Sequence, residues 1–460
     1  PKKSLILSDI PQSDPKESTY SRVAELVQEK GITQLYAIGH ELADFKSLFP
    51  ASTKFYPSTE AFLQHSFDTF EKEVVLIKGA RSFGFEQIAK QLTERIHRTV
   101  LEIDLDAVTH NLNVYRHLLK PETKLLIMVK ALAYGSGGSE IAHLLQFHKV
   151  DYLGVAYVDE AVQLRKAGIN LPIMVINPSE EDLPNLVTYD IEPEIYSFLQ
   201  LKTFSEFYLK KGIALKGHFT INTGMNRLGF DPEDLTTLIA QINAQPHIKV
   251  QSLYTHLAAS DEPQHNEFSL QQLQSFKGYA EKVEQQLGIK TIKHALNSAG
   301  IVAYPEYQFD MVRLGIGLYG IEPCGNLQHE LKSISTLKTV ISQIRNVKKG
   351  ETIGYGRKGK VTKNMRMATI AIGYADGFSR IFSNGNGQVM LNGQMAKVIG
   401  NVCMDMTMID ISNIEAEEGD SVIIFGEKPT ISELAKNAKT IPYEILTNVS
   451  DRVKRIYFAE

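Results

Sequence analysis

A lysine stands directly after the most hydrophobic run of the chain. Residues 125–138 read LLIMVKALAYGSGG, so five apolar residues lead into Lys130 and a turn of small residues follows. Such a run is typical of a buried strand, and an amine at its end either reaches water along its apolar stem or takes part in chemistry. Polar residues elsewhere in the chain decide between these two roles.

Four other predicted strands carry polar side chains at or near their ends. They are Arg227 after the strand at 215–222, His256 at the end of 248–256, Asn297 and Ser298 at the end of 293–298, and Arg313 within 311–315. Taken alone, His256 would be interpreted as a buried core histidine and Arg313 as part of a surface ion pair. Barrel enzymes build their sites at the carboxyl ends of the strands, so this shared position predicts one common site.

The same face offers a place for a phosphate group. Loops after the last two strands of a barrel often hold phosphate, and here they supply the Ser298 hydroxyl and the backbone amides of Gly315 and Ile316. A lysine opposite a phosphate site suggests pyridoxal 5'-phosphate, which is held as a Schiff base on lysine. We therefore expect this cofactor, and we expect no metal.

These residues need elements that bring strand ends together. Eight predicted strands alternate with helical segments, at 124–130, 151–156, 172–176, 191–196, 215–222, 248–256, 293–298 and 311–315. Strands that alternate with helices indicate a parallel sheet, and eight such units predict a (β/α)8 TIM barrel over residues 98–333. The first strand of that range is a candidate to join the domain that follows.

Different patterns flank the barrel. Residues 334–460 contain strands joined by glycine turns, which predicts an all-β domain with mainly antiparallel pairing. Residues 1–97 alternate strand and helix signals, which predicts a small α/β domain of its own. The predicted fold class is therefore α/β, with a TIM barrel followed by an all-β domain and preceded by a small α/β domain.

Composition excludes several classes of protein. The formal net charge of −4 gives no support for nucleic-acid binding, and no apolar stretch approaches the roughly 20 residues that span a bilayer. The two cysteines, Cys324 and Cys403, cannot form a disulfide framework. A cytoplasmic enzyme that acts on a small molecule fits these features best.

Motifs throughout residues 98–460 resemble those of bacterial alanine racemases. They are EIDLDAVTHNL, VKALAYGSGG, TGMNRLGF, YTHLAASDE, NSAG, MVRLGIGLYG, GYGR, IGYADGFSR and IGNVCMDM, and they follow one another in the order of that family. The resemblance implies a barrel that carries pyridoxal phosphate, an all-β carboxyl-terminal domain, and a homodimer whose sites are each completed by the partner's β domain. It also implies racemisation of alanine, which supplies D-alanine for peptidoglycan.

Carried over residue by residue, the resemblance implies two acid/base groups, Lys130 and Tyr355, the second reaching across from the other subunit. The implied cofactor-binding residues are Lys130, Tyr134, Arg227, His256, Asn297, Ser298, Arg313, Gly315 and Ile316. The implied substrate-binding residues are Arg227, Met404, Tyr374 and Asp405.

These implied roles agree with the chemistry of racemisation, which removes a proton from one face of Cα and delivers one to the other. Lysine and tyrosine are both protonated at neutral pH, so each needs a perturbed pKa to act as a base. Arg313 would contact the pyridine nitrogen of the cofactor, and arginine can only donate hydrogen bonds. It would leave that nitrogen unprotonated, which weakens the electron sink and favours reprotonation over decarboxylation or transamination.

The sequence departs from the family beside Arg227. The family usually carries a carbamylated lysine at the position of Thr220 and an acid at that of Asn222. Neither residue can supply the negative charge that would brace the arginine. Because an unpaired buried charge recruits a counter-ion or water, we expect chloride or ordered water bonded to Thr220, Asn222 and Arg227.

Residues 1–97 lie outside that resemblance. YSRVAELVQEKGITQLYAIG and VVLIKGARSFGFEQIAKQL resemble the carboxyl-terminal domain of the ligase that adds D-alanyl-D-alanine to the UDP-N-acetylmuramoyl-tripeptide. The chain contains no P-loop motif, and it opens on Pro1 rather than on methionine. We therefore expect a ligase–racemase fusion cut within its ligase. The alternative is a generic α/β domain used only for docking.

Two other functions share the barrel and the cofactor. Decarboxylases of basic amino acids usually place an acid at the pyridine nitrogen, which Arg313 argues against. Small barrel proteins that carry the cofactor without clear catalysis lack the β domain, and the motif GYGR after the barrel argues for an enzyme. Whether serine is accepted beside alanine stays open.

Overall fold

A computed structural model of the chain describes residues 2–11, 16–64, 70, 73–88, 92 and 99–459. The chain divides into two units, Pro1–Arg98 and Thr99–Glu460. Among the described residues, no helix has the length and apolar character needed to cross a membrane.

The smaller unit contains a parallel sheet of four strands in the order β3-β2-β1-β4. The strands are β1 (Lys2–Ser8), β2 (Gln34–Ile38), β3 (Lys54–Tyr56) and β4 (Glu73–Lys78), and the helices are α1 (Lys16–Glu29), α2 (His40–Asp44) and α3 (Thr59–Leu63). Alternate residues of β1 face opposite sides, so Leu5 and Leu7 enter one apolar cluster and Ile6 enters another. The helix expected over residues 85–97 falls largely on positions 89–91 and 93–97, which lie outside the described residues.

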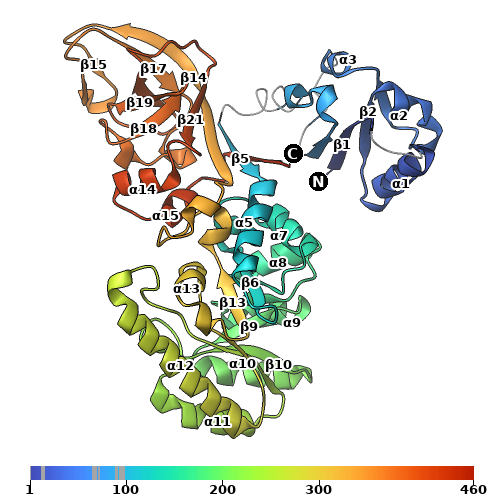
Figure 1. The fold of residues 1–460 in the computed structure, drawn as a ribbon, viewed down its shortest axis with the longest axis vertical. Coiled ribbons are helices and arrows are strands. Elements are labelled where there is room, and N and C mark those ends of the chain that lie inside the picture. Colours follow the sequence, from blue (N-terminus) through green and yellow to red (C-terminus); the bar gives the residue numbers. More distant parts are fainter. Residues whose placement is uncertain are drawn as a thin grey trace. The chain divides into compact units, whose positions relative to one another are not determined.

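The larger unit is built on eight parallel strands, as predicted (Figure 1). They are β6 (Lys124–Met128), β7 (Tyr152–Val155), β8 (Ile173–Val175), β9 (Glu192–Ile195), β10 (Leu215–Thr220), β11 (Ile248–Tyr254), β12 (Ile292–His294) and β13 (Met311–Leu314). Each pairs with the next, β13 pairs with β6, and the ring closes where Asp310 and Arg313 donate backbone hydrogen bonds to Lys293 and Leu296. The predicted barrel is confirmed.

Helices connect the barrel strands. They are α5 (Leu105–His117), α6 (Lys130–Tyr134), α7 (Gly138–Phe147), α8 (Val158–Lys166), α9 (Leu183–Thr188), α10 (Phe198–Lys211), α11 (Leu235–Asn243), α12 (Asn266–Leu287) and α13 (Ser298–Ala303). Some expected strand ends are wrong: β6 ends at Met128, so Lys130 begins α6, and β11 ends at Tyr254, before His256. Asn297 and Ser298 do not end the seventh strand, because the Asn297 side chain accepts a hydrogen bond from the Gly300 amide and so caps α13, which Ser298 begins.

The all-β domain forms a second eight-stranded sheet, in the order β17-β20-β19-β18-β21-β14-β5-β22. Its strands are β5 (Val100–Asp104), β14 (Ser335–Val347), β17 (Met365–Ile370), β18 (Gln388–Leu391), β19 (Gln394–Ile399), β20 (Thr407–Asp410), β21 (Ser421–Phe425) and β22 (Lys454–Phe458); β15 (Thr352–Ile353) and β16 (Gly359–Lys360) form a separate hairpin. The long strand β14 also pairs with β17, which closes the sheet on itself. Two helices accompany it, α14 (Ile431–Ala438), which was expected, and α15 (Pro442–Thr447), which was not.

This sheet takes strands from both sides of the barrel in sequence. β5 precedes the barrel, yet it pairs with β14 and, in parallel, with β22 at the end of the chain. One continuous apolar cluster includes Leu101 and Ile103 of β5, the barrel core, and Leu446 of α15. The barrel and the β domain are therefore packed together as a single unit, which lets residues of the β domain support the strand ends.

Candidate active site

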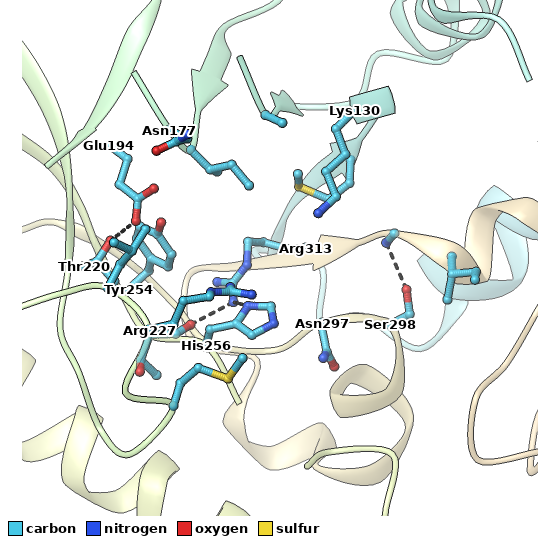
Figure 2. A pocket seen from close by; sticks show the side chains of 18 of the residues that line it. Lys130, Asn177, Glu194, Thr220, Arg227, Tyr254, His256, Asn297, Ser298 and Arg313 are labelled. Atoms are coloured by element: carbon cyan, nitrogen blue, oxygen red, sulfur yellow. Dashed lines mark hydrogen bonds between the residues drawn. The ribbon is translucent and has the colours of Figure 1, made fainter. Parts of the chain in front are cut away.

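A cavity of about 430 Å³ opens at the carboxyl ends of the barrel strands. It is lined by nine residues that the sequence singled out, namely Lys130, Tyr134, Arg227, His256, Asn297, Ser298, Arg313, Gly315 and Ile316. Figure 2 shows Lys130, Arg313, His256 and Ser298 converging from separate elements. The strand ends therefore bring these residues into one site.

The turn that carries Lys130 has an unusual backbone. Residues 131–134 all lie in the left-handed region, with φ of 51°, 53°, 51° and 54°, although none is glycine. Each such residue costs roughly 1–2 kcal/mol, so surrounding contacts must hold the turn in place. Glu160 accepts the Ala131 amide at 2.5 Å, and Arg455 donates from Nε to the Gly135 carbonyl at 3.0 Å.

The environment of Lys130 favours its neutral amine. Burial lowers the pKa of Lys130, the positive charge of Arg227 lowers it further, and Glu160 acts in the opposite direction. Glu160 does not line the cavity, since its carboxylate is engaged by the backbone amides of Ala131, Ala156 and Tyr157. The amine therefore faces the cavity in a setting that eases loss of its proton.

Arg313 lies beneath the cavity at one end of a chain of hydrogen bonds through the barrel. Its Nη1 lies 2.8 Å from His294 Nδ1, and His294 Nε2 lies 2.9 Å from Ser252 Oγ. The chain continues from Ser252 Oγ to His218 Nδ1 at 2.7 Å, and from His218 Nε2 to the Glu192 carboxylate at 3.0 Å. Because arginine can only donate, His294 Nδ1 must accept and its Nε2–H must donate to Ser252. The serine hydroxyl can then donate to His218, whose Nε2–H donates to the carboxylate.

This chain of bonds fixes the guanidinium. Nη2 of Arg313 also donates to the carbonyls of Thr255 at 2.7 Å and Ala295 at 3.0 Å. Burial lowers the pKa of Arg313 to about 10, which still leaves it protonated at neutral pH. The arginine is therefore a rigid, donor-only group in the floor of the cavity.

His256 adds a neutral ring beside Arg313. Burial away from water lowers the pKa of His256 to about 3, and the positive charges of Arg313, Arg227 and Lys130 act in the same direction. The imidazole therefore carries no charge near neutral pH and offers a flat, uncharged face to a ligand.

A small cradle lies beside α13. Ser298 Oγ accepts hydrogen bonds from the amides of Gly315 at 2.9 Å and Gly317 at 3.2 Å. A Cβ atom added at Gly315 would lie 2.9 Å from the Tyr134 hydroxyl and 3.7 Å from Ser298 Oγ, so both hydroxyls converge on this glycine. The tyrosine ring is fixed against Tyr319, with ring centroids 4.5 Å apart. Because Ser298 Oγ accepts from both amides, its O–H can donate beside that of Tyr134, and converging donors of this kind suit an anion.

The structure corrects the expectation for Arg227 and its neighbours. Arg227 is exposed and makes no hydrogen bond or ion pair with the described residues. The amide of Asn222 donates to Asn226 and Asp231, and the hydroxyl of Thr220 donates to Glu194. The predicted chloride bonded to all three groups is therefore wrong, because the donors of Thr220 and Asn222 are already engaged, and the version with ordered water stays a prediction.

Sequence reasoning missed Glu194. It lies on β9, is 2 % exposed, and lines the cavity. Burial raises its pKa to about 7, while hydrogen bonds from Thr220 and Tyr254 and the charges of Arg227 and Arg313 act in the opposite direction. The available signal was the segment IEPEIY, which places two acids at alternate positions of a buried strand.

Four predicted residues do not line the cavity of their own chain. Tyr355, Tyr374, Met404 and Asp405 lie on the surface of the β domain, and the first three are 73 %, 40 % and 53 % exposed. Hydrogen bonds link their loops. The backbone amide of Tyr374 donates to the Cys403 carbonyl, that of Ala375 donates to the Met404 carbonyl, and the side-chain amide of Asn401 donates to the Tyr355 carbonyl. They form one exposed patch, in which Asp405 pairs with Arg452 at 2.8 Å.

The fold and the cavity define a class of protein, namely a barrel enzyme whose site lies at the strand ends and whose barrel is joined to an all-β domain. Two family models match the larger unit: "Alanine racemase, N-terminal domain" over residues 103–323 and "Alanine racemase, C-terminal domain" over residues 334–457. The chain belongs to the alanine racemase family, whose members are pyridoxal-phosphate-dependent amino-acid racemases.

Individual relatives agree with this membership. The chain is 36 % identical over 370 residues to the alanine racemase of Clostridium tetani, a match that covers 78 % of this chain and 95 % of that protein. The solved alanine racemase of Clostridium difficile 630 is similar at 36 % identity and a TM-score of 0.75, covering 79 % of this chain and 96 % of that one. The alanine racemase of Bartonella henselae, solved with covalently bound pyridoxal phosphate, is 30 % identical with a TM-score of 0.73, covering 79 % of this chain and 100 % of that one.

Proposed function

We propose that the larger unit interconverts L- and D-alanine, using pyridoxal 5'-phosphate held in the barrel cavity. The observation that carries this proposal is the meeting of the Lys130 amine with the donor-only guanidinium of Arg313 in one cavity. Membership of the alanine racemase family supports it.

The residues of the cavity fit the cofactor. Lys130 would hold it covalently, and the hydroxyls of Tyr134 and Ser298 with the amides around Gly315 would bind its phosphate. His256 would pack on its ring, and Asn297 and Ile316 line the same wall. When bound, the cofactor supplies an electron sink that makes the Cα–H bond of an amino acid acidic.

Arg313 would limit that sink. The bonds to His294, Thr255 and Ala295 hold its guanidinium in one orientation, with donors only. A donor at the pyridine nitrogen leaves that nitrogen without a proton. A weaker sink shortens the life of the carbanion, which favours return of a proton to Cα over loss of carbon dioxide.

Two groups on opposite sides of Cα would move the proton. Lys130 is the first, because burial and Arg227 lower its pKa and make its amine available as a base near neutral pH. Tyr355 is 73 % exposed on the β domain, outside the cavity of its own chain. The partner's Tyr355 would be the second group, which requires a homodimer.

The remaining residues would hold the substrate. Arg227 faces the cavity with an unengaged guanidinium, which suits it to the substrate carboxylate. The partner's Met404 would offer a backbone contact, the partner's Tyr374 would line the entrance, and the partner's Asp405 would stand nearby. All three belong to the same exposed patch as Tyr355.

The finer assignments are proposals too. We propose that residues 1–97 derive from a ligase of the D-alanyl-D-alanine-adding type in a ligase–racemase fusion. The enzyme would then act in the cytoplasm, where D-alanine enters peptidoglycan synthesis. The smaller unit would tether consecutive steps of D-alanine use.

Racemisation of L-alanine, followed by a coupled assay for D-alanine with and without added pyridoxal phosphate, tests the proposal. We expect D-alanine to form in a cofactor-dependent manner until both isomers are equal. Release of carbon dioxide and an amine would instead indicate a decarboxylase, and cofactor binding with no product would indicate a non-catalytic carrier. Serine in place of alanine measures the breadth of the site.

A further inference from the structure

The charges that line the cavity are unbalanced. Lys130, Arg227 and Arg313 are basic, and His256 is neutral because its pKa is lowered to about 3. Among the described residues that line the cavity, only Glu194 carries a carboxylate. A single buried acid among three cations needs a reason, because burying a carboxylate costs free energy unless it is paired.

Glu194 is held in a fixed position. The hydroxyl of Thr220, on the neighbouring strand, donates to its Oε1, and Tyr254, on the strand after that, lies within hydrogen-bond reach (Figure 2). Both donors are themselves buried, at 5 % exposed for each. The carboxylate therefore cannot leave the cavity to reach water.

Arg227 differs from Glu194, because its backbone is fixed while its side chain makes no hydrogen bond within the described part of the chain. Asn222 Oδ1 accepts the amides of Gly224 and Asn226, and the loop closes through backbone bonds between Thr220 or Asn222 and Phe230. The guanidinium at its tip has no partner among the described residues. Arg227 nevertheless lines the cavity, and its positive charge acts on Glu194 and Lys130, so attraction between charges has to keep it there.

We propose that Glu194 is a positioning residue, whose carboxylate holds the guanidinium of Arg227 in the cavity by attraction of opposite charges, ready for the carboxylate of the amino-acid substrate. This inference rests on the proposed function and deepens it. Glu194 contacts neither Cα nor the proton that moves, so it acts through Arg227. It would supply from β9 the negative charge that Thr220 and Asn222 lack.

The charged and titratable groups around Glu194 determine when it can act. Tyr254 on β11, Arg313 on β13 and Arg227 in the loop after β10 act on its carboxyl, and Tyr196 directly follows β9. Lys130 adds positive charge from across the cavity. Since burial raises the pKa of Glu194 to about 7, its attraction for Arg227 is present above pH 7 and is lost as the pH falls below it.

The test compares holoenzymes of wild type, Glu194→Gln and Glu194→Asp. Calorimetric titration with propionate, a carboxylate that has no amino group, is carried out from pH 6 to pH 9 on protein with a full complement of bound cofactor. We expect wild type to bind propionate more weakly below pH 7, and Glu194→Gln to bind it about tenfold more weakly at pH 8 with no such pH dependence. Glu194→Asp keeps the charge and should keep the pH dependence.

Thr220→Val and kinetics provide an independent check. Loss of the Thr220 hydroxyl removes a bond that lowers the pKa of Glu194, so the pH dependence should move to higher pH. For L-alanine, Glu194→Gln should raise KM about tenfold and change kcat less than about threefold, which separates positioning from proton transfer. The matched control is Glu284→Gln, another buried glutamate, whose partners are Thr291 and Lys293 and which should leave KM unchanged.

Unchanged or tighter propionate binding by Glu194→Gln at pH 8 would overturn the inference. The Glu194 carboxylate would then have no influence on binding, or it would only repel anions. If Glu194→Gln does not fold, the outcome depends on Thr220→Val, whose pH dependence must shift for the inference to stand. Wild-type protein that binds propionate in the expected manner but does not racemise alanine would refute the proposed function and leave the role of Glu194 supported.

Discussion

Arg455 Nε donates a 3.0 Å hydrogen bond to the carbonyl of Gly135, five residues after Lys130. The same guanidinium donates to the carbonyls of Val449, Ser450 and Val453 at 2.7–2.8 Å. The last strand of the chain thus holds the left-handed turn that aims the lysine. The turn is further enclosed by α15, because a Cβ atom at Gly135 would lie 2.5 Å from the Leu446 carbonyl.

Removal of this guanidinium should weaken both the fold and the site. Arg455→Met leaves four carbonyls without their donor, and we expect a loss of about 2–4 kcal/mol in the free energy of unfolding. Racemase activity should fall as well, because the turn of Lys130 loses a support. Denaturant unfolding and the alanine assay measure both effects. The exposed neighbour Lys454→Met is the control, and equal behaviour of the two variants would contradict this role.

Lys130→Ala should abolish covalent attachment of the cofactor. Purified wild-type holoenzyme is expected to keep its visible absorption through dialysis, since Lys130 is the amine that faces the cavity. Lys130→Ala should lose that absorption on dialysis and show no activity. Lys124→Ala, at the exposed start of the strand that precedes Lys130, should behave as wild type. Retention of the covalent spectrum by Lys130→Ala would refute the assignment.

Two inactive variants should restore activity when they are mixed. Lys130→Ala and Tyr355→Phe, after subunit exchange, should recover about a quarter of wild-type activity, because half of the dimers are mixed and each mixed dimer has one intact site. The control mixture combines Lys130→Ala with the double variant Lys130→Ala/Tyr355→Phe and should stay inactive. No recovery in the first mixture, despite proven exchange, would mean that sites are not shared between subunits.

The raised pKa of Glu194 predicts a pH-dependent stability. Its carboxyl has a pKa of about 7 in the folded chain and near 4.5 when unfolded, so between these values the unfolded state binds fewer protons. Stability of the apoenzyme should therefore fall as pH rises from about 4.5 to 7, by up to roughly 3 kcal/mol from this group. Glu194→Gln should remove that contribution, measured by urea unfolding at pH 5 and pH 8. An unchanged slope would contradict it.

Glycine should relieve strain in the lysine turn. Leu132 has a φ of 53° and a side chain that is 40 % exposed, so Leu132→Gly removes little burial and frees the backbone. We expect the free energy of unfolding to rise by roughly 0.5 kcal/mol. This is the strain relieved in the folded chain, less the entropy that glycine adds to the unfolded chain. Leu118→Gly, where φ is −81° and exposure is 37 %, should instead destabilise. Thermal unfolding compares the two, and equal shifts would argue against strain.

The barrel could be predicted because buried strands need runs of apolar residues, and such runs are visible in the sequence. Apolar runs marked the strands, and polar residues at their ends marked the cavity, so Lys130, His256 and Arg313 could be placed before any coordinates. Asn297 and Ser298 were assigned to a strand because they directly follow HAL, whereas the Asn297 side chain accepts the Gly300 amide and so caps a helix there. The left-handed turn could not be expected, since residues 131–134 contain no glycine.

Glu194 was missed for a different reason. Alternation along β9 shows that Glu192 and Glu194 share a face, but not that one contacts His218 deep in the barrel while the other reaches the cavity. That distinction depends on the stagger between neighbouring strands, in which His218 pairs with Glu194 and Thr220 pairs with Tyr254. Long-range register of this kind leaves no local signal in one sequence.

The pairing of β5 with β22 has a consequence for biosynthesis. About 350 residues separate the two strands, and the whole barrel lies between them. At a translation rate of roughly 5–20 residues per second, β5 leaves the ribosome some 20–70 s before its partner exists. During that interval the edge of β5 that β22 occupies in the folded chain is open to other strands. Until β22 is made, Arg455 cannot donate to the Gly135 carbonyl, so the lysine turn of the barrel lacks that support.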